Sequence, residues 1–337
     1  MGWEAFPPFG IKTFRQIGGQ APQNNFQIIL RKIWRAGVKK LKENCFALLA
    51  EFRRAETRSG ANQAFSVQKR FELRSAIATM ILKIFQLNIL KGLYLDRIIS
   101  YLQENDFDII CLQEVTGGEL GEKNSRDCFQ ELKDELNCFG KVSYDLQNPT
   151  DPKSYFGNAI FFHKNYQINN LKTIYAEQNR IVDYQKIITT PNWAMIPRHC
   201  LVLKMQINNI DISILTAHAP WSKYPTDSPE KIEFAKKITT YLQTLKEPFV
   251  LTGDFNMQSS SQTIQIINKV SNNLIDEYKV TNTLNSHIHY AAKEIFPAGL
   301  AVDYIFTSKD MKINDFKVID TLDLSDHYGL AVEIDLT

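Results

Sequence analysis

The sequence has few features that would stabilise a secreted or zinc-bound fold. It contains five cysteines in 337 residues, an odd number without any Cys-x-x-Cys pair, at positions 45, 111, 128, 138 and 200. Disulfide frameworks use even sets of cysteines and thiolate zinc sites use closely spaced pairs, so the pattern argues against both. We therefore expect a reduced, intracellular protein, with the cytoplasm as its default location.

Long apolar runs are also missing. No stretch approaches the roughly 18 to 20 apolar residues that a membrane-spanning helix requires. The N-terminus lacks the short basic region and continuous apolar core of a secretory signal. Membrane insertion is therefore not expected. Acidic residues are scarce in the first 80 positions, which leaves a transit peptide for an organelle open.

The two parts of the chain carry opposite charges. Residues 1–80 hold 14 lysines and arginines against 5 acidic residues, whereas the rest of the chain holds 25 against 32. The overall formal charge of +2 hides this contrast. A basic arm on an acidic body is typical of proteins that meet nucleic acid, an anionic membrane or an acidic partner.

One segment of the basic arm has helical periodicity. Apolar residues recur at helical spacing from Leu30 to Phe52, with lysines and arginines between them, which predicts a basic amphipathic helix. Its apolar stripe could pack on the body or on another chain, or residues 28–54 could attach to anionic lipid or nucleic acid. We expect residues 1–79 to be a partly helical or disordered extension, dispensable for chemistry, and residues 80–337 to be the folded domain.

Strand and helix signals alternate from Met80 onward. Strands are predicted at 82–89, 108–113, 158–163, 200–207, 210–217, 248–253, 302–307 and 330–335. Helices are predicted at 92–104, 126–138, 228–245 and 260–273. Asn208-Asn209, between two β-rich runs, indicates an antiparallel hairpin. Mixed sheets covered by helices follow, so we expect an α/β sandwich rather than a purely parallel sheet.

Polar residues stand at the ends of six of these predicted strands. They are Asn88, Glu114, His218, Asp254, Asp303 and the pair Asp326-His327. In "LTGDFNM" the side chains of Asp254 and Asn256 would face one side if the segment is extended, and an ordinary turn is the alternative. One polar strand end marks a turn, but six of them indicate a shared cavity.

The residue types at these ends suit phosphate chemistry around a hard cation. Carboxylate and amide oxygens are preferred by Mg²⁺, which needs only one or two protein carboxylates. The histidines and a further aspartate suit general acid/base work and stabilisation of a phosphate oxyanion. Zinc is a poorer match, because three-histidine and cysteine-rich ligand sets are missing. The sequence therefore predicts a Mg²⁺ or Mn²⁺ site.

Several motifs together resemble the endonuclease/exonuclease/phosphatase superfamily. They are "LN" at 87–88, "LQEV" at 112–115, "GNAIFF" at 157–162, "TAHAP" at 216–220, "GDFN" at 253–256, "VDYIF" at 302–306 and "SDHYGL" at 325–330. Their order and spacing both match, over about residues 81–337. The resemblance implies a four-layer sandwich, in which two packed mixed β-sheets are flanked by helices, and divalent-metal hydrolysis of phosphoesters. It does not extend to the basic arm.

The resemblance also implies roles around the metal and the attacking water. Glu114 resembles the principal metal ligand, Asn88 its neighbour near metal and phosphate, and Asp326 a residue beside the metal. Asp254 resembles the group that orients or deprotonates the water, and Asn256 helps to hold that water.

The histidines are assigned to the phosphate by the same resemblance. His327 resembles the phosphate-contacting histidine, which Asp303 orients. His218 matches the histidine of pancreatic-type deoxyribonucleases, which contacts the phosphate and serves the leaving oxygen. The implied reaction is in-line attack of water on phosphorus, with metal and histidines stabilising the developing charge.

Substrate choice is expected to depend on the loops around the site. Arg198 directly precedes the strand that leads toward the "TAHAP" motif, and Trp221 follows that motif. We assign both to substrate binding, together with Asn158 of the "GNAIFF" motif. His287 and His289 are further candidates for substrate contact. Because they stand two positions apart in a loop, we favour this role over a pair of metal ligands.

A nuclease is the function that we expect first, because of the basic arm and the histidine in "TAHAP". The acidic body argues against broad non-specific DNA binding. One alternative is a phosphodiesterase or phosphatase acting on a lipid headgroup or small phosphorylated molecule, with the arm at a membrane surface. A second alternative is a non-catalytic nucleic-acid-binding module. We expect the protein to be a monomer.

Overall fold

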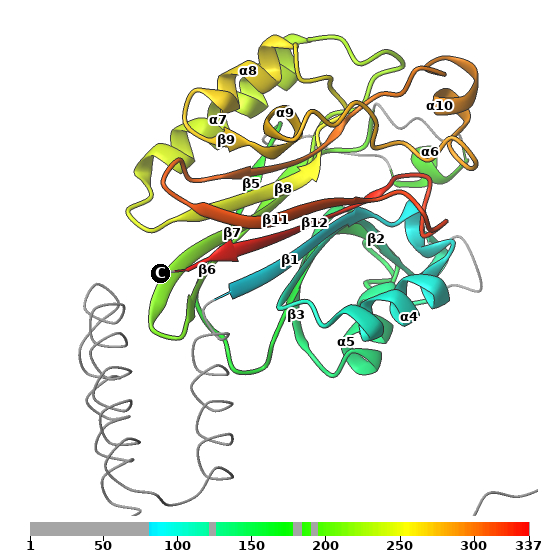
Figure 1. Cartoon of the computed structure of the whole chain (residues 1–337). Helices are drawn as coiled ribbons and strands as arrows, with labels where there is room; N and C mark the ends of the chain where they lie inside the picture. The colour runs from blue at the N-terminus through cyan, green and yellow to red at the C-terminus, as the bar shows by residue number, and fades with distance from the viewer. Residues whose placement is uncertain (1–80, 121–125, 178–183, 190–194, 337) are drawn as a thin grey trace, which may run out of the picture. The chain divides into compact units, whose positions relative to one another are not determined.

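The computed structural model describes residues 81–336, except 121–125, 178–183 and 190–194. The predicted extension of residues 1–79, with its amphipathic helix and contact region, lies outside the described residues and is drawn in grey in Figure 1. None of the helices in the described part combines the length and the apolar content that crossing a membrane requires.

Two mixed sheets of six strands each form the middle of the domain (Figure 1). The first has the order β11 (Lys312–Ile319), β12 (Gly329–Asp335), β1 (Ile81–Asn88), β2 (Ile109–Gly117), β4 (Tyr155–Phe162), β3 (Phe139–Gln147). The second has the order β5 (Gln167–Tyr175), β6 (His199–Ile207), β7 (Ile210–His218), β8 (Phe249–Asp254), β10 (Asp303–Thr307), β9 (Asn272–Asn273). Pairing is parallel between β1 and β2 and between β7 and β8, and antiparallel between the other neighbours.

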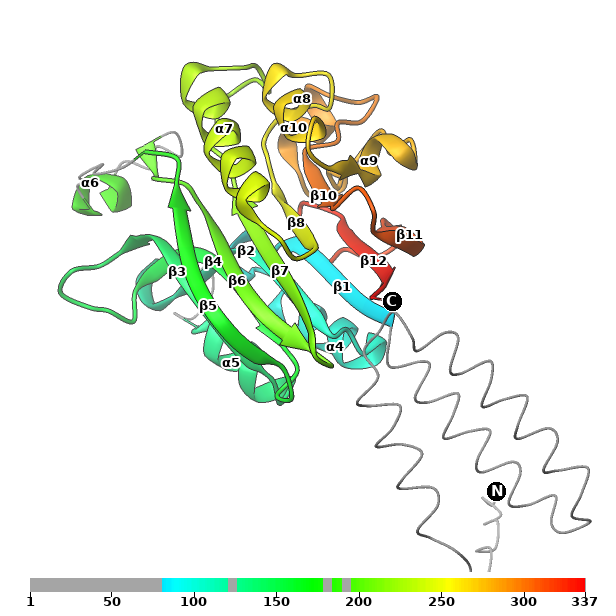
Figure 2. The ribbon, with the colours of Figure 1, turned by 90° about the vertical axis from the view of Figure 1, so that its left-hand side faces the viewer.

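Helices cover the outer faces of both sheets. On the first sheet lie α4 (Leu95–Asn105) and α5 (Cys128–Glu135), and on the second lie α7 (Pro229–Thr244), α8 (Gln262–Asn268) and α9 (Leu274–Glu277). The shorter elements are η1 (Leu90–Gly92), η2 (Gly118–Leu120), α6 (Tyr184–Thr189) and α10 (Tyr290–Glu294). Figure 2 shows α7 running along the strands that it covers. The expected four-layer sandwich is therefore confirmed.

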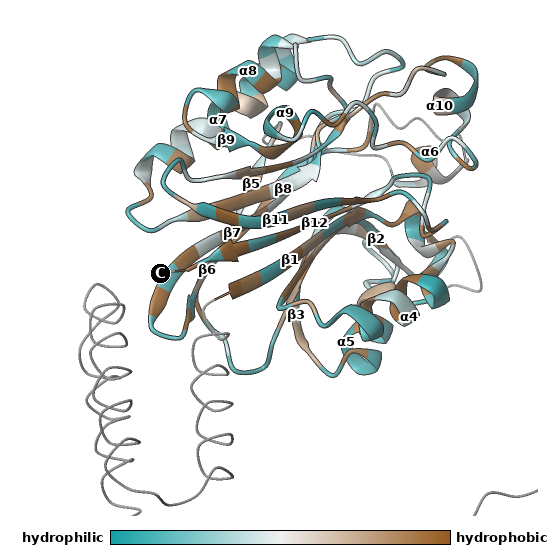
Figure 3. Ribbon diagram, viewed as in Figure 1, coloured by the Kyte–Doolittle hydropathy of each residue, from teal (hydrophilic) through white to brown (hydrophobic). Residues whose placement is uncertain are grey.

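The alternation of side chains along each strand builds two apolar layers. In β1, Leu82 and Ile84 belong to the cluster between the sheets, whereas Phe85 and Leu87 pack with Leu95 and other residues of α4 and α5. Successive side chains of a strand point to opposite faces, so one strand serves both layers. Figure 3 shows the brown, apolar residues concentrated in the strands.

Every strand that the sequence pattern missed lies at the edge of a sheet. The eight predicted strands correspond to β1, β2, β4, β6, β7, β8, β10 and β12, and the missed ones are β3, β5, β9 and β11. Edge strands have only one neighbour, and residues of β3, β5 and β11 are largely exposed or half-buried. Polar residues therefore interrupt the apolar pattern on which strand prediction depends.

Two local predictions have different outcomes. The antiparallel hairpin is confirmed, because Asn208 and Asn209 have φ values of 50° and 66° and β6 pairs antiparallel with β7. These left-handed values are the ones that a two-residue hairpin turn needs. The predicted helix 260–273 is too long: α8 ends at Asn268, and Asn272–Asn273 form β9 instead. Its last residues pair with β10 because a backbone edge is available there.

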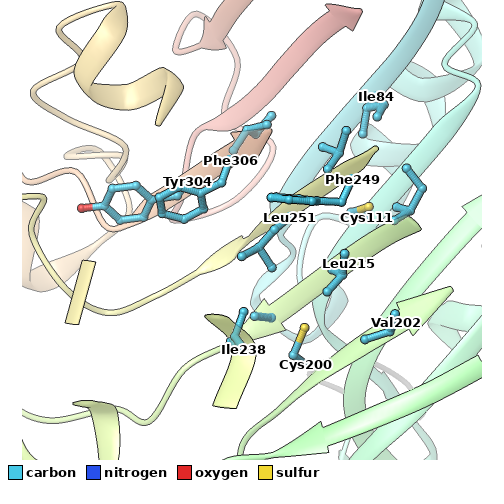
Figure 4. Packing of buried hydrophobic residues seen from close by; sticks show 14 of the residues in the cluster. Ile84, Cys111, Cys200, Val202, Leu215, Ile238, Phe249, Leu251, Tyr304 and Phe306 are labelled. Atoms are coloured by element: carbon cyan, nitrogen blue, oxygen red, sulfur yellow. The ribbon is translucent and has the colours of Figure 1, made fainter. Parts of the chain in front are cut away.

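An aromatic cluster supports the strands that carry the polar ends. The rings of Tyr304 and Phe306 are stacked with centroids 5.3 Å apart, and the ring of Phe255 meets both edge-on. The Tyr304 hydroxyl donates to the Met257 carbonyl oxygen (2.8 Å). Figure 4 shows Tyr304 and Phe306 among the buried residues of this layer. The cluster fixes the chain just after β8 and at the start of β10.

Candidate active site

Side chains from the carboxyl ends of β1, β7 and β8 and from the middle of β2 meet between the two sheets. Gln113 Nε2 donates to Thr216 Oγ1 (2.7 Å), and Asn88 Nδ2 donates to Asp254 Oδ2 (3.1 Å). Farther along the same face of β1, Ile84 belongs to the apolar layer. The space between the sheets is therefore apolar over most of its length and polar at this end, where the predicted site residues come together.

Asp254 is the centre of this polar group. Its Oδ2 atom lies 3.5 Å from His218 Nε2 and 3.8 Å from His327 Nε2, while Oδ1 accepts a hydrogen bond from the Asn256 backbone (2.9 Å). Its side chain is 2% exposed. Burial raises the pKa of Asp254 to about 6, against the opposing charge of His327. A carboxylate with such a pKa is suited to take up a proton near neutral pH.

His327 is held by the carboxylate of Asp303. The Nδ1–H group of His327 donates to Asp303 Oδ2 (2.8 Å). The same carboxylate accepts hydrogen bonds from Thr283 Oγ1 (2.7 Å) and Gln86 Nε2 (3.2 Å). Burial by itself lowers the pKa of His327, but the charges of Asp303 and Asp254 outweigh it and hold the pKa well above its ordinary value. His327 is therefore a buried cation, with Nε2–H free to face an anion beside Asp254.

His218 is neutral, in contrast to the cationic His327. Arg198 Nη1 lies 3.4 Å from His218 Nδ1, and because a guanidinium can only donate, Nδ1 must accept. The proton of the neutral ring is then on Nε2, which faces Asp254. Burial first and the positive charge of Arg198 second hold the pKa of His218 well below its ordinary value. His218 can donate a hydrogen bond to a phosphoryl or leaving oxygen, but it holds no extra proton to transfer.

Glu114 reaches the site by a bulge rather than at a strand end. β2 continues to Gly117, and its pairing with β4 shifts between Leu112 and Val115, so Gln113 and Glu114 both oppose Asn158. Glu114 has a φ of 57°. A β-bulge re-aims a side chain in this way. The expectation that Glu114 ends its strand is wrong, because this reorientation occurs within the strand.

The residues around Glu114 fit a hard divalent cation. After burial, the charge of Asp326 is the next cause that raises the pKa of Glu114, to about 7, so a cation between the two carboxylates would relieve their repulsion. Asn88 Oδ1 accepts a hydrogen bond from the Leu90 backbone (3.1 Å) and retains a second lone pair. Two carboxylates and an amide oxygen match the protein ligands that Mg²⁺ takes while keeping several waters.

Two other groups of potential ligand atoms occur among the described residues. In Asp254, Asp303 and His327, and in His289, Asp326 and His327, one ligand atom per residue lies within 4.8 Å of the others. In the first group, His327 Nδ1 and Asp303 are already hydrogen-bonded to each other. In that group the His327–Asp303 pair is therefore an orienting contact.

The segment "GDFN" is both a turn and part of the site. Asn256 has a φ of 51°, its backbone N–H bonds to Asp254, and its Nδ2 donates to the Ala219 carbonyl oxygen (3.2 Å). The assumption of an extended segment is therefore wrong, since β8 ends at Asp254 and the chain turns. A Cβ atom at Gly253 would lie 2.0 Å from the Ala217 carbonyl oxygen, so only glycine fits beside β7 at this point.

The three predicted substrate-binding residues lie in different environments. Arg198 is 2% exposed, with Nη1 3.5 Å from Asp145 Oδ2 and its Nε without a hydrogen-bond partner in the described part of the chain. Asn158 is buried, and its Nδ2 donates to the His199 carbonyl oxygen (3.1 Å). Trp221 is 39% exposed. Arg198 is buried and contacts His218 Nδ1, so it orients that ring. Trp221 is accessible to a ligand.

Three supporting residues were missed in the sequence. Gln86, Gln113 and Thr283 are all buried. Gln86 donates to Gln113 and to Asp303, Gln113 donates to Thr216, and Thr283 donates to Asp303. Gln86 precedes Asn88 by two positions, and Gln113 lies inside "LQEV", so strand periodicity could have indicated both. Thr283 stands in a loop 20 residues before Asp303, and no pattern in the sequence marks it.

The fold recurs in solved structures at low sequence identity. A mannosyl-6-phosphatase from Bacteroides thetaiotaomicron has a TM-score of 0.55 at 16% identity, over 75% of this chain and 99% of that chain. The human Nocturnin catalytic domain with bound sulfate has a TM-score of 0.55 at 17% identity, over 76% and 94%. D. rerio TDP2 complexed with single-strand DNA product has a TM-score of 0.53 at 15% identity, over 75% and 98%. A comparison with curated proteins gives no match.

These structural similarities show the fold, and a family model shows the family. The model of the Endonuclease/Exonuclease/phosphatase family matches residues 85–327. This span is well over half of the chain and includes every site residue discussed above. The fold, the motifs and the clustered site residues agree with that match, and the chain belongs to the endonuclease/exonuclease/phosphatase family.

Proposed function

We propose that this phosphoester hydrolase is a Mg²⁺-dependent phosphodiesterase that acts on nucleic acid, with Mn²⁺ as a substitute cation. The observation that carries the proposal is the position of Asp254 between Asn88, His218 and His327. A base of raised pKa stands there beside one cationic and one neutral imidazole. This arrangement suits attack of water on a negatively charged phosphorus centre.

The proposed reaction divides the work among these side chains. Asp254 orients the water and accepts its proton, because its pKa lies near the pH of the reaction. The His327 cation binds a non-bridging phosphoryl oxygen, and His218 Nε2–H stabilises the leaving oxygen as its bond to phosphorus breaks. The leaving oxygen then takes a proton from solvent water, and Asp254 returns to solvent the proton that it took from the attacking water. Glu114, Asp326 and Asn88 would hold the cation, which when bound supplies Lewis-acid stabilisation of the phosphoryl oxygens.

The alternatives to a nuclease are a phosphodiesterase or phosphatase that acts on a lipid headgroup or small molecule, and a non-catalytic nucleic-acid-binding module. The fold neighbours include both a complex with single-strand DNA and a mannosyl-6-phosphatase, so the scaffold accommodates large and small substrates. The basic arm favours a polyanion, whereas the acidic body favours a small phosphate or lipid headgroup. A non-catalytic binding module would have lost part of the site, and all of the predicted residues are present.

Metal-dependent hydrolysis by the full chain tests the proposal directly. We expect cleavage of single-stranded DNA or RNA that requires Mg²⁺ and stops with chelator. The panel also includes double-stranded DNA, sphingomyelin, phosphoinositides and bis(p-nitrophenyl) phosphate. His327→Ala serves as the inactive control, because it removes the cation that binds phosphate. Exclusive cleavage of a lipid or a small ester would replace the nuclease by the first alternative, and turnover that survives chelation would contradict the metal site.

The extension gives a second test. A fragment of residues 80–337 is expected to fold and to keep its turnover of bis(p-nitrophenyl) phosphate, because both sheets and the whole site lie within it. Binding to single-stranded DNA should weaken and lose part of its salt dependence without the basic arm. Circular dichroism and fluorescence anisotropy at several salt concentrations measure the two effects. An unfolded or inactive fragment would show that the arm belongs to the catalytic domain.

A further inference from the structure

A third histidine lies at the site and has no role in the proposed reaction. His289 immediately precedes α10, and its ring centroid is 5.6 Å from that of His327 at an interplanar angle of 82°. One ligand atom of His289 lies within 4.8 Å of corresponding atoms of Asp326 and His327. His289 is half-buried and open to solvent, whereas His218 and His327 are buried.

The hydrogen bond of His289 fixes its tautomer. The Ala292 backbone N–H donates to His289 Nδ1 (3.2 Å), so the lone pair of Nδ1 is occupied and this nitrogen carries no proton. The proton of the ring must then be on Nε2. The backbone N–H of His289 bonds to the Asn285 carbonyl oxygen (2.7 Å). Both contacts hold the residue in place without using Nε2.

A fixed Nε2–H group distinguishes a substrate contact from a metal ligand. A histidine that binds metal through Nε2 needs the lone pair there and donates its other N–H to an acceptor. His289 has the reverse arrangement, because its Nδ1 accepts. The group that it offers to the site is therefore a hydrogen-bond donor, which suits an anionic oxygen.

We propose that His289 is a substrate-binding residue, whose Nε2–H donates to a phosphoryl oxygen of the substrate beside His327. The proposal rests on the proposed phosphoester substrate. Capping of α10 alone does not account for a histidine here, since serine, threonine, aspartate and asparagine make the same bond with shorter side chains. Histidine adds a second ring nitrogen, in a ring that lies edge-on to that of His327 and close to Asp326.

Two substitutions separate the cap from the donor. His289→Asn places an amide oxygen near the position of Nδ1, which keeps the bond from Ala292 and removes the donor at Nε2. His289→Gln places an amide N–H near the position of Nε2 and gives up the cap. His163→Asn is the matched control, because His163 Nδ1 also accepts a backbone N–H, that of Asn165 (3.5 Å), and His163 is exposed next to Asp108, at the opposite end of β2 from Glu114.

Steady-state kinetics of the full chain on bis(p-nitrophenyl) phosphate provide the first readout. We expect His289→Asn to lower kcat/KM about 10-fold to 100-fold, mostly through KM, and His289→Gln to stay within about threefold of the wild type. His163→Asn should behave as the wild type. Equal losses in both His289 variants, or a loss of Mg²⁺ affinity in His289→Asn, would overturn the proposal in favour of a structural or metal-related role.

Imidazole ¹⁵N NMR provides a readout that needs no activity. His289 is expected to show the Nε2–H tautomer in the free protein and a shift of its Nε2 signal on addition of inorganic phosphate. An Nδ1–H tautomer, or no shift at saturating phosphate, would refute the assignment. If the wild type hydrolyses no phosphoester, the proposed function fails by itself and the NMR result still decides the role of His289. If the wild type is active and His289→Asn matches it, the His289 proposal alone fails.

Discussion

Replacing Asp254 with alanine is expected to lower kcat for a phosphodiester by roughly 10³-fold. Asp254 accepts hydrogen bonds from the Asn88 amide and the Asn256 backbone, and its Oδ2 atom lies 3.5 Å and 3.8 Å from Nε2 of His218 and His327. Its removal takes away the base and the anion against which the imidazoles are oriented. KM should change much less, because the phosphate contacts of His218 and His327 remain. Stopped-flow or steady-state kinetics at saturating Mg²⁺ measure kcat and KM.

The fold should survive this substitution. The side chain that is lost is buried but lies at the polar end of the layer, outside the apolar clusters. Asp310→Ala, an exposed aspartate in the turn after β10, is the matched control and should retain wild-type turnover and melting temperature. Near-normal kcat in Asp254→Ala would remove Asp254 from the reaction and with it the assigned mechanism.

Glu114→Gln is expected to abolish most of the Mg²⁺-dependent activity, by roughly 10²-fold to 10³-fold. It removes one of the two carboxylates proposed to hold the cation, Glu114 and Asp326, whose negative charges influence each other. Calorimetric titration with Mg²⁺ should show weaker binding, and added Mg²⁺ should partly restore the rate. Glu104→Gln, an exposed residue of α4, is the control. Unchanged Mg²⁺ affinity in Glu114→Gln would place the metal elsewhere.

The same variant should change the pH dependence of stability in the metal-free protein. Burial and the charge of Asp326 raise the pKa of Glu114 from 4.5 to about 7. Between these values the folded state binds more protons than the unfolded state, so the free energy of unfolding falls as pH rises. We therefore expect Glu114→Gln to melt at a higher temperature than the wild type at pH 8 and at the same temperature at pH 4. Thermal unfolding in chelator tests this, and a lower melting temperature of the variant at pH 8 would contradict it.

The central strands and the polar side chains that gather at one end of the sandwich could be predicted from the sequence. Buried strands such as β1 and β8 are continuous apolar runs, and a polar residue that ends such a run is visible as an exception. Asn88, His218 and Asp254 were found in this way. Edge strands carry no such contrast, and β3, β5, β9 and β11 were missed for that reason.

The geometry of the site depended on the tertiary structure. The sequence places Glu114 next to Gln113 without showing that a bulge in β2 turns its side chain. It also gives no sign that Arg198 contacts His218 across 20 residues and sets its tautomer. Protonation states follow from partners and burial, and these arise only when segments far apart in the chain are brought together.

The sequence by itself thus determined the family, the alternating strands and helices, and the residue types that gather at one end of the sandwich. Those properties are local, since they depend on periodicity and on short motifs. Only the tertiary structure decided that His327 is a cation held by Asp303, that His218 is neutral beside Arg198, and that His289 Nδ1 accepts from the Ala292 backbone next to the ring of His327. Each of these is set by a partner whose distance and burial no linear pattern encodes.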